Sequence, residues 1–183
     1  MSPVPRLYSL VIFALCASAH FILQYPKSLG FDDDIESTAP CGGFDVSFNA
    51  SDDSVQVGGF AVSMLSTHPA ANWLFRVTLD KQAPFNWTNL LPVVSETGLG
   101  QFCLPALQAP SDFAGQPGVV QVIQQGPDGI LYQVSRCRMC HYVEGLRLRF
   151  CCSSNNFNHS ALQLTSLREP TPQSVRHVQM SLA

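Results

Sequence analysis

The segment NWLFRVTLD, residues 72–80, alternates between two faces with a period of two residues. One face is wholly apolar and consists of Trp73, Phe75, Val77 and Leu79. The other face is mixed and carries Arg76, Thr78 and Asp80 beside Leu74. Successive side chains of a strand point to opposite sides of a sheet, so this pattern predicts a half-buried β-strand.

Further strand patterns occur along the chain, separated by glycine and proline. Residues 53–65 (DSVQVGGFAVSML) contain a Gly-Gly pair that predicts a bend, and QGPDG (125–129) predicts a turn between two apolar runs. The Pro-rich stretch 83–117 predicts an ordered loop with room for a short helix. Short strands without a helix-length amphipathic pattern favour an all-β fold, an immunoglobulin-like antiparallel β-sandwich.

The first 19 residues have the features of a secretory signal. Arg6 precedes an apolar run, Leu7–Cys16, that is shorter than the roughly 20 residues a membrane-spanning helix needs. The tripeptide Ala17-Ser18-Ala19 matches the small-residue pattern at which signal peptidase cuts. We therefore expect a signal peptide over residues 1–19 and a secreted, extracellular or cell-wall protein.

Cleavage after Ala19 makes His20 the first residue of the mature protein, which changes its chemistry. An N-terminal histidine offers its α-amino group and its ring Nδ1 as a chelate, and the amine has a reference pKa of roughly 7.7–8. With one more imidazole, these nitrogens suit a tetragonal Cu(II) site. His68 is the best second candidate, because it follows a predicted strand and begins a Pro-containing turn; the weaker candidates are His141, His159 and His177.

The chain changes composition at residue 134. Residues 20–133 hold 3 Lys and Arg against 11 Asp and Glu, whereas residues 134–183 hold 6 Arg against 2 Glu. The first part lacks the basic patches that nucleic-acid binding requires. We expect one copper-binding β-sandwich domain over residues 20–133, incomplete as it stands, and an atypical segment over 134–183 that is intron-derived or disordered.

The mature chain has an even number of cysteines, which in a secreted protein first indicates disulfide bonds. These are Cys41, Cys103, Cys137, Cys140, Cys151 and Cys152, and their pairing stays open. Three sequons make Asn49, Asn86 and Asn158 candidate glycosylation sites. The C-terminal sequence RHVQMSLA lacks the hydrophobic tail of a lipid-anchor signal, and no membrane span is expected in the mature chain.

A set of motifs resembles a known family. HFILQYPKSLGFDDD, APCGGF, GGFAV, STHPAANW and GVVQVIQ…GILYQ follow one another between residues 20 and 133. Together they resemble a family of secreted fungal proteins, the lytic polysaccharide monooxygenase-like copper-binding or copper acquisition factor family. The resemblance implies a copper "histidine brace" in which His20 supplies amine and Nδ1 and His68 a ring nitrogen. It also implies a nearby carboxylate, and copper handling at the cell surface rather than polysaccharide oxidation.

The chain departs from this family after Gln133. The family typically continues with Cys-Ala-Asp, where this chain has Val134-Ser135-Arg136. An arginine cannot ligate a metal because its guanidinium stays protonated. The resemblance therefore leaves the third copper-side ligand open, and the usual partner of Cys41 or Cys103 missing.

Three functions follow from these observations. The first is a secreted Cu(II)-binding protein without enzymatic activity, with copper as ligand and a cell-surface copper transporter or a cell-wall component as partner. The second is a copper-dependent oxidative enzyme that cleaves polysaccharide, for which an exposed aromatic surface is needed. Trp73 is expected in the core, which leaves Trp87 as the best exposed candidate. The third is a surface module that has lost its metal.

Overall fold

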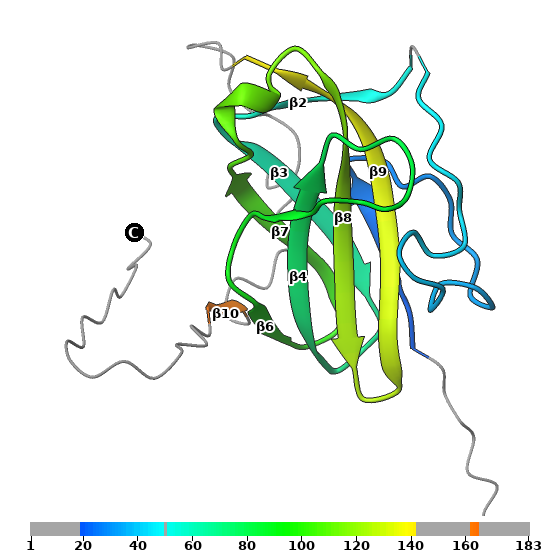
Figure 1. Cartoon of the computed structure of the whole chain (residues 1–183). Helices are drawn as coiled ribbons and strands as arrows, with labels where there is room; N and C mark the ends of the chain where they lie inside the picture. The colour runs from blue at the N-terminus through cyan, green and yellow to red at the C-terminus, as the bar shows by residue number, and fades with distance from the viewer. Residues whose placement is uncertain (1–18, 50, 142–161, 165–183) are drawn as a thin grey trace, which may run out of the picture.

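Two β-sheets packed face to face form the molecule (Figure 1), as the predicted all-β class requires. The computed structural model describes residues 19–49, 51–141 and 162–164. Its strands are β1 (Phe21–Tyr25), β2 (Asp53–Gln56), β3 (Phe60–Ser66), β4 (Ala70–Thr78), β5 (Thr88–Asn89), β6 (Val94–Thr97), β7 (Gly100–Leu107), β8 (Pro117–Gly126), β9 (Gly129–Cys140) and β10 (Leu162–Leu164). A 3-10 turn, η1 (Ser111–Phe113), joins β7 to β8.

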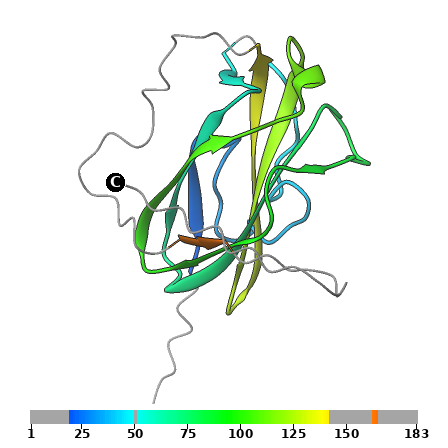
Figure 2. The same ribbon diagram turned by 90° about the vertical axis from the view of Figure 1, so that its left-hand side faces the viewer.

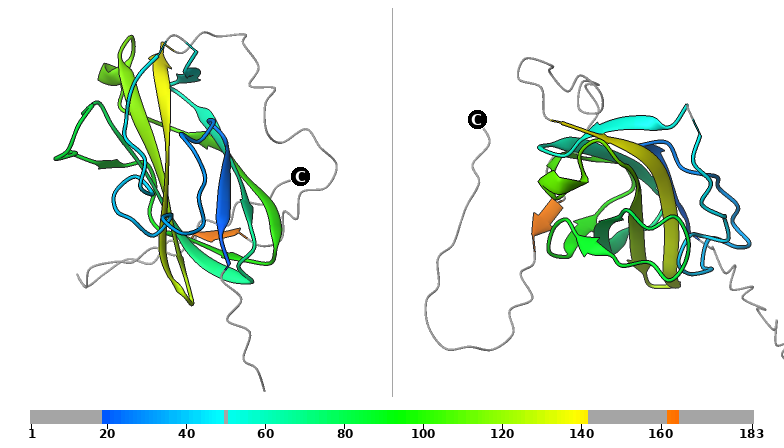
Figure 3. Two further views of the ribbon diagram at one scale, coloured as in Figure 1. Left: turned by 90° about the vertical axis from the view of Figure 1, so that its right-hand side faces the viewer. Right: turned by 45° about the horizontal axis from the view of Figure 1, so that its top comes forward.

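The smaller sheet has the strand order β1-β3-β7 and the larger sheet the order β10-β6-β4-β8-β9-β2, with β5 added to β4. Figure 2 and the left view of Figure 3 show the two layers from the side. All pairs are antiparallel except β2 and β9, which run parallel. The chain reaches β2 from β1, a strand of the smaller sheet, through the long segment 26–52. The predicted sandwich is therefore confirmed, with one parallel edge.

The core lies between the sheets and is built from the inward face of the alternating strands. Trp73, Phe75 and Val77 of β4 have no exposed surface, as their spacing predicts. Phe21 of β1 packs edge-on against the Trp73 ring, with ring centres 5.1 Å apart. This contact joins the two sheets at the end of the sandwich where the mature chain would begin.

The stretch 83–117, predicted as a loop, forms β5, β6, β7 and η1 instead. The pattern of β6 is hidden because one of its two buried residues, Glu96, is charged rather than apolar. Pro105 interrupts β7, which is an edge strand of the smaller sheet and so tolerates a residue without an N–H donor. By contrast, the predicted turn at QGPDG is confirmed, since β8 ends at Gly126 and β9 begins at Gly129.

The outer face of β9 is covered by the irregular segment 26–52, which runs beside it in the right view of Figure 3. The Leu29 N–H donates to the Val134 carbonyl and the Tyr132 N–H to the Glu36 carbonyl, both at 2.9 Å. Gly42, at φ +64°, passes so close that an added Cβ would lie 2.2 Å from the Tyr132 oxygen. Segment 26–52 is therefore a third layer that brings Glu36 to the sheet.

A second buried cluster lies under this third layer and contains Cys41, Val119 and Val134. β9 continues past the boundary predicted at residue 133, and its residues still alternate between inward and outward positions to Cys140. Val134, which stands where the family's cysteine was expected, therefore packs in one cluster with Cys41. The domain division at residue 133 stays a prediction.

Cys41, Cys137 and Cys140 carry free thiols, and no disulfide joins any two cysteines of the described residues. Burial raises the pKa of the Cys137 thiol to about 12. Cys151, Cys152 and Asn158 lie outside the described residues, so the predicted disulfides stay predictions.

Asn49 and Asn86 are both exposed and accessible to glycosylation. Within residues 19–49 and 51–141 there is no helix of the length and apolarity that crossing a bilayer demands.

Candidate metal centre

The antiparallel pairing of β1 with β3 brings the two predicted histidines to the same end of the sandwich. Phe21, the first residue of β1, pairs with Ser66, the last residue of β3. His20 therefore lies opposite Thr67, whose N–H donates to the His20 carbonyl at 3.0 Å. His68 is the next residue, so the ladder between these two neighbouring strands places residues 20 and 68 at the same end of the sandwich.

His68 is almost completely buried and contacts a carboxylate that sequence reasoning missed. Its Nε2 lies 2.5 Å from Oδ1 of Asp128, in the β8–β9 turn. The other carboxylate oxygen of Asp128 accepts the Ala19 N–H at 3.1 Å. Burial opposes ionisation of Asp128, but the hydrogen bonds from His68 and Ala19 outweigh it and lower its pKa. Asp128 thus connects His68 to the residue that precedes His20.

Gly126 gives this histidine and carboxylate the space they need. An added Cβ at Gly126 would lie 2.4 Å from Cδ2 and 2.5 Å from Nε2 of His68, and 3.1 Å from the Asp128 carboxylate. Real Cβ contacts are not that short, so any other residue would displace the His68 ring. The glycine of the QGPDG turn therefore has a role at the site beyond ending the strand.

A second carboxylate holds the His20 ring. Nδ1 of His20 lies 3.1 Å from Oε2 of Glu36, which is 2% exposed, and Nε2 lies 4.0 Å from Asp33. Phe31 meets the ring edge-on at 6.0 Å between ring centres. Burial raises the pKa of Glu36, although hydrogen bonds from Gln133 and His20 act in the opposite direction. The Asp-rich segment that follows Phe31 is therefore placed directly beside His20.

Gln133, the last residue of the GILYQ motif, ties β1, β9 and Glu36 together. Its Oε1 accepts the Leu23 N–H at 2.9 Å, and its Nε2 donates to the Phe21 carbonyl and to Oε1 of Glu36 at 2.7 Å. The side chain is buried, and each of these bonds satisfies a group that is out of contact with water. This amide keeps Glu36 aligned with the His20 ring.

Beneath His68 lies a buried polar network. The Ser66 hydroxyl accepts the His68 N–H at 3.2 Å and the Gln124 amide at 2.8 Å. The Trp73 indole donates to Glu96 at 2.9 Å. Three buried atoms in this region have no described partner, namely Nδ1 of His68 and one Oε1 each of Glu96 and Gln124. The network leaves one imidazole nitrogen of His68 without a hydrogen bond.

Glu96 makes the stability of the fold depend on pH. Burial raises its pKa to about 7, against the hydrogen bond from Trp73 and the charge of His68. A raised folded pKa means that ionisation of Glu96 opposes folding, so the contribution of Glu96 to stability is full below pH 4.5 and is lost as the pH rises through about 7. The shift corresponds to about 3 kcal/mol. We expect Glu96→Gln to abolish this loss, which urea unfolding of both proteins at pH 5 and pH 8 would measure. An equal loss in the variant would contradict this account.

Carboxylates contact both histidines, whereas three of the described basic side chains contact other parts of the molecule. Arg136 pairs with Asp52 at 3.2 Å, Arg76 lies over the Trp87 ring and Lys81 over the Phe48 ring. The resemblance implied a third copper-side carboxylate at residue 136. Arg136 stands there instead, and it contacts Asp52 rather than His20 or His68. In Figure 1 the β8–β9 turn marks the acidic end, opposite β2.

Apolar side chains are also exposed at this acidic end. Ile22 is the second residue of β1, two positions after His20. Phe31 contacts the His20 ring, and Ile130 follows the turn that holds Asp128. Leu99 lies between Gly98, which is hydrogen-bonded to Pro69, and Gly100, which pairs with Ser66. They are the exposed large apolar side chains of the described residues. The metal centre is therefore surrounded by a mixed acidic and apolar surface.

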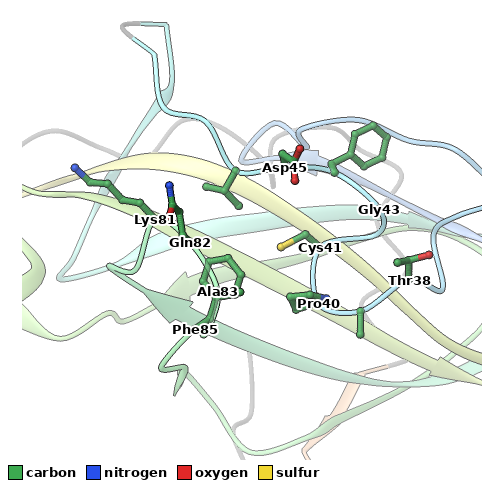
Figure 4. A pocket seen from close by; sticks show the side chains of 12 residues that line it. Thr38, Pro40, Cys41, Gly43, Asp45, Lys81, Gln82, Ala83 and Phe85 are labelled. Carbon is green, nitrogen blue, oxygen red and sulfur yellow. The ribbon is translucent and has the colours of Figure 1, made fainter.

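A pocket of about 490 Å³ lies elsewhere, between segment 38–46 and segment 81–85 (Figure 4). Cys41, Lys81 and Phe85 are among the residues that line it. Its lining contains no histidine, and it belongs to the outer layer over β9 rather than to the end where His20 and His68 lie. It is therefore separate from the candidate metal centre.

The described side chains alone do not form a ready metal site. No three His, Cys, Asp or Glu side chains within residues 19–49 and 51–141 converge in a metal-binding arrangement. The predicted brace also needs the backbone nitrogen of His20, which is not a side-chain donor. In the uncleaved chain this nitrogen is still a peptide N–H bonded to Ala19. In this form the nitrogen donates to Thr67 rather than offering a lone pair.

Residues 18–160 match the family model of the copper acquisition factor BIM1-like domain. This chain belongs to the BIM1-like family. Membership gives it a copper-related function, and the family's typical location is extracellular. The match extends past residue 134 and includes all of β9 and the carboxylates at both histidines.

Two relatives of this BIM1-like chain are fungal proteins. One, uncharacterized protein AFUA_6G02800 of Aspergillus fumigatus, is 32% identical over 165 residues, which are 85% of this chain and 67% of that protein. The other, lytic polysaccharide monooxygenase-like protein X325 of Yarrowia lipolytica, is 33% identical over 128 residues. That match covers 63% of this chain and 47% of the relative, so the chain spans about half the length of the Yarrowia protein.

Among solved structures, a zinc complex of ScLPMO10B aligns with a TM-score of 0.38 at 17% identity. The alignment covers 47% of this chain and 51% of that chain.

The residues at the site of this BIM1-like chain fit a metal ion that prefers nitrogen ligands. Nδ1 of His68 is buried without a partner, and Asp128 and Glu36 carry carboxylates at the two rings. Imidazole, amine and carboxylate are donors that Cu(II) accepts in a tetragonal arrangement.

Proposed function

We propose that the mature form of this protein, beginning at His20, binds one Cu(II) ion in a histidine brace and handles copper outside the cell. The amine and ring of His20 and the ring of His68 would supply the nitrogens, and Asp128 the nearby carboxylate. The observation that carries the proposal is the Asp128 carboxylate, which contacts His68 at 2.5 Å and the N–H next to His20 at 3.1 Å. One carboxylate therefore contacts the ring of His68 and the residue directly before His20.

Removal of the leader peptide would change two groups together. The peptide nitrogen of His20 becomes an amine with a lone pair, and the Asp128 oxygen now bonded to Ala19 becomes available. Copper, as the cargo, would then neutralise part of the charge of Asp128, Glu36 and Asp33, which lie together without a described Lys or Arg partner among them. First-row metal affinity peaks at copper, so such nitrogen donors favour Cu(II) over zinc.

The direct test is a copper titration of protein whose N-terminus has been verified by mass spectrometry. We expect the protein that begins at His20 to bind one Cu(II) ion, with the paramagnetic resonance spectrum of a tetragonal nitrogen site. We expect His68→Ala to lower the affinity by about a hundredfold, since one of three nitrogen donors is lost. His141→Ala is the matched control and is expected to leave the affinity unchanged, because His141 lies in a different pocket.

Two results of this titration would contradict the proposal. Copper binding that is equal in wild type and His68→Ala would remove His68 from the site. A secreted protein that begins at another residue would remove the amine of His20. Retention of the fold in each variant would be checked by thermal unfolding without metal.

The alternative is oxidative cleavage of polysaccharide by the same copper ion. The Yarrowia relative is named a lytic polysaccharide monooxygenase-like protein, which supports this alternative. Trp73 is buried, as predicted, and of the exposed large apolar residues in the described part only Phe31 is aromatic. Incubation of the copper-loaded protein with chitin or cellulose and a reductant separates the two functions. Oxidised oligosaccharides would favour the enzyme, and their absence together with tight copper binding favours the carrier.

A further inference from the structure

Thr67 makes three hydrogen bonds to the backbone of His20. The His20 N–H donates to the Thr67 hydroxyl at 2.8 Å, and this hydroxyl donates to the His20 carbonyl at 2.9 Å. The Thr67 N–H donates to the same carbonyl at 3.0 Å. Both polar atoms of the residue-20 backbone are thus held by one residue, which directly precedes His68.

The proton count on this hydroxyl decides what it can do. A threonine hydroxyl has one proton and two lone pairs, and here the proton is directed to the His20 carbonyl. Towards the His20 nitrogen the hydroxyl can therefore act only as an acceptor. After cleavage the neutral amine has two N–H bonds and one lone pair. Acceptance of one N–H by Thr67 leaves the lone pair free and restricts rotation about the Cα–N bond.

No other described hydroxyl is in position to do this. The Ser66 hydroxyl is occupied by the His68 N–H and the Gln124 amide, within the buried network beneath the ring. The Asp128 carboxylate contacts the nitrogen of residue 19, one position earlier in the chain.

We propose that Thr67 is a positioning residue for copper, which holds the freed amine of His20 with its lone pair directed at the ion that His68 also binds. This inference rests on the proposed function, because it presumes that the amine is a ligand. The energetic contribution comes from pre-organisation, since a fixed donor does not lose its rotational freedom when the ion binds. The same strand ladder then determines the positions of both the His68 imidazole and the His20 amine.

The test is a double-mutant cycle between the hydroxyl and the amine. One change is Thr67→Val, which removes the hydroxyl and keeps a β-branched side chain of similar shape. The other is retention of Ala19 with its amine acetylated, which replaces the amine of residue 20 by an amide, adds no new amine and leaves all side chains unaltered. Copper affinity is measured for the four proteins by competition with a chelator. A positioning role requires the two changes to be coupled.

We expect Thr67→Val to weaken Cu(II) binding about tenfold in the protein that begins at His20, and less than twofold in the form that retains Ala19. Thr67→Ser keeps the hydroxyl and is expected to restore the affinity. A tenfold loss in both backgrounds would identify a merely structural effect and overturn the inference. An unchanged affinity of Thr67→Val in the mature form would overturn it too.

Thr78→Val is the control for loss of a threonine hydroxyl that hydrogen-bonds to the backbone at a different place in the fold. The Thr78 hydroxyl accepts the Asp80 N–H at 3.0 Å, at the far end of β4 from His68, and its loss is expected to leave copper affinity unchanged. Failure of the proposed function is recognised separately, since wild-type protein beginning at His20 would then not bind copper at all. Weakened binding in Thr78→Val equal to that in Thr67→Val would also count against a specific role for Thr67.

Discussion

Protein that keeps Ala19, with the amine of Ala19 blocked by acetylation, is expected to bind Cu(II) about a thousandfold more weakly than protein that begins at His20. The reason is chemical, because an amide nitrogen at neutral pH has no lone pair to offer a metal, whereas the amine completes a chelate with the ring of the same residue. In the uncleaved chain the Ala19 N–H also occupies an oxygen of Asp128. Loss of these contributions corresponds to about 4 kcal/mol of binding free energy.

The measurement is a chelator competition on the two forms, each produced with a defined N-terminus. Thermal unfolding without metal is the control, and we expect equal midpoints, because Ala19 precedes β1 and adds one hydrogen bond at an exposed position. Equal copper affinity of the two forms would mean that side chains alone hold the ion. The brace would then be the wrong description of this site.

Val134→Cys is expected to form a disulfide bond with Cys41 and to stabilise the oxidised protein by about 4 kcal/mol. Cys41, in segment 26–52, and Val134, in β9, belong to one buried cluster, so we expect the new thiol to lie near the existing one. A cross-link over a loop of about 90 residues removes much of the conformational entropy of the unfolded chain, which gives the size of the effect. The added bond would fix the layer that carries Glu36.

Urea unfolding of oxidised and reduced Val134→Cys measures this stabilisation, with mass spectrometry to establish the bond. The double variant Cys41→Ala/Val134→Cys is the control and is expected to lack the gain. A thiol pair that stays reduced under air would show that the two side chains do not meet the geometry of a disulfide. Burial raises the pKa of Cys41, so its oxidation is expected to be slow without a catalyst.

The strands whose inward residues are apolar could be predicted from the sequence. Trp73, Phe75 and Val77 alternate in β4, and the Pro-Asp-Gly turn after β8 has a local cause that needs no tertiary information. β6 was missed because a buried glutamate stands at one of its inward positions. That glutamate is acceptable there because Trp73, on the next strand, donates to it, and the sequence gives no sign of such a contact.

The candidate site likewise combines residues that local sequence features predict with residues that only the tertiary fold brings together. His20 and His68 could be proposed from a cleavage pattern and a turn, which are local features. Asp128 is 60 residues from His68 and was interpreted only as a turn residue; it reaches the ring after β8 and β9 have paired beside β4. Glu36 depends on a loop that crosses the outside of the sheet. Both carboxylates therefore reach the histidines only through the tertiary fold, which local sequence patterns do not predict.

The separation of charge along the sandwich affects how quickly an ion arrives. Carboxylates gather where His20 and His68 lie, while Arg136 pairs with Asp52 and Arg76 and Lys81 lie over aromatic rings elsewhere. Within the described residues, the carboxylates at this end attract cations from a distance, and dissolved salt weakens such attraction. On the proposed function, we expect capture of copper to be fastest in dilute media, while its escape, governed by short-range bonds, keeps the same rate.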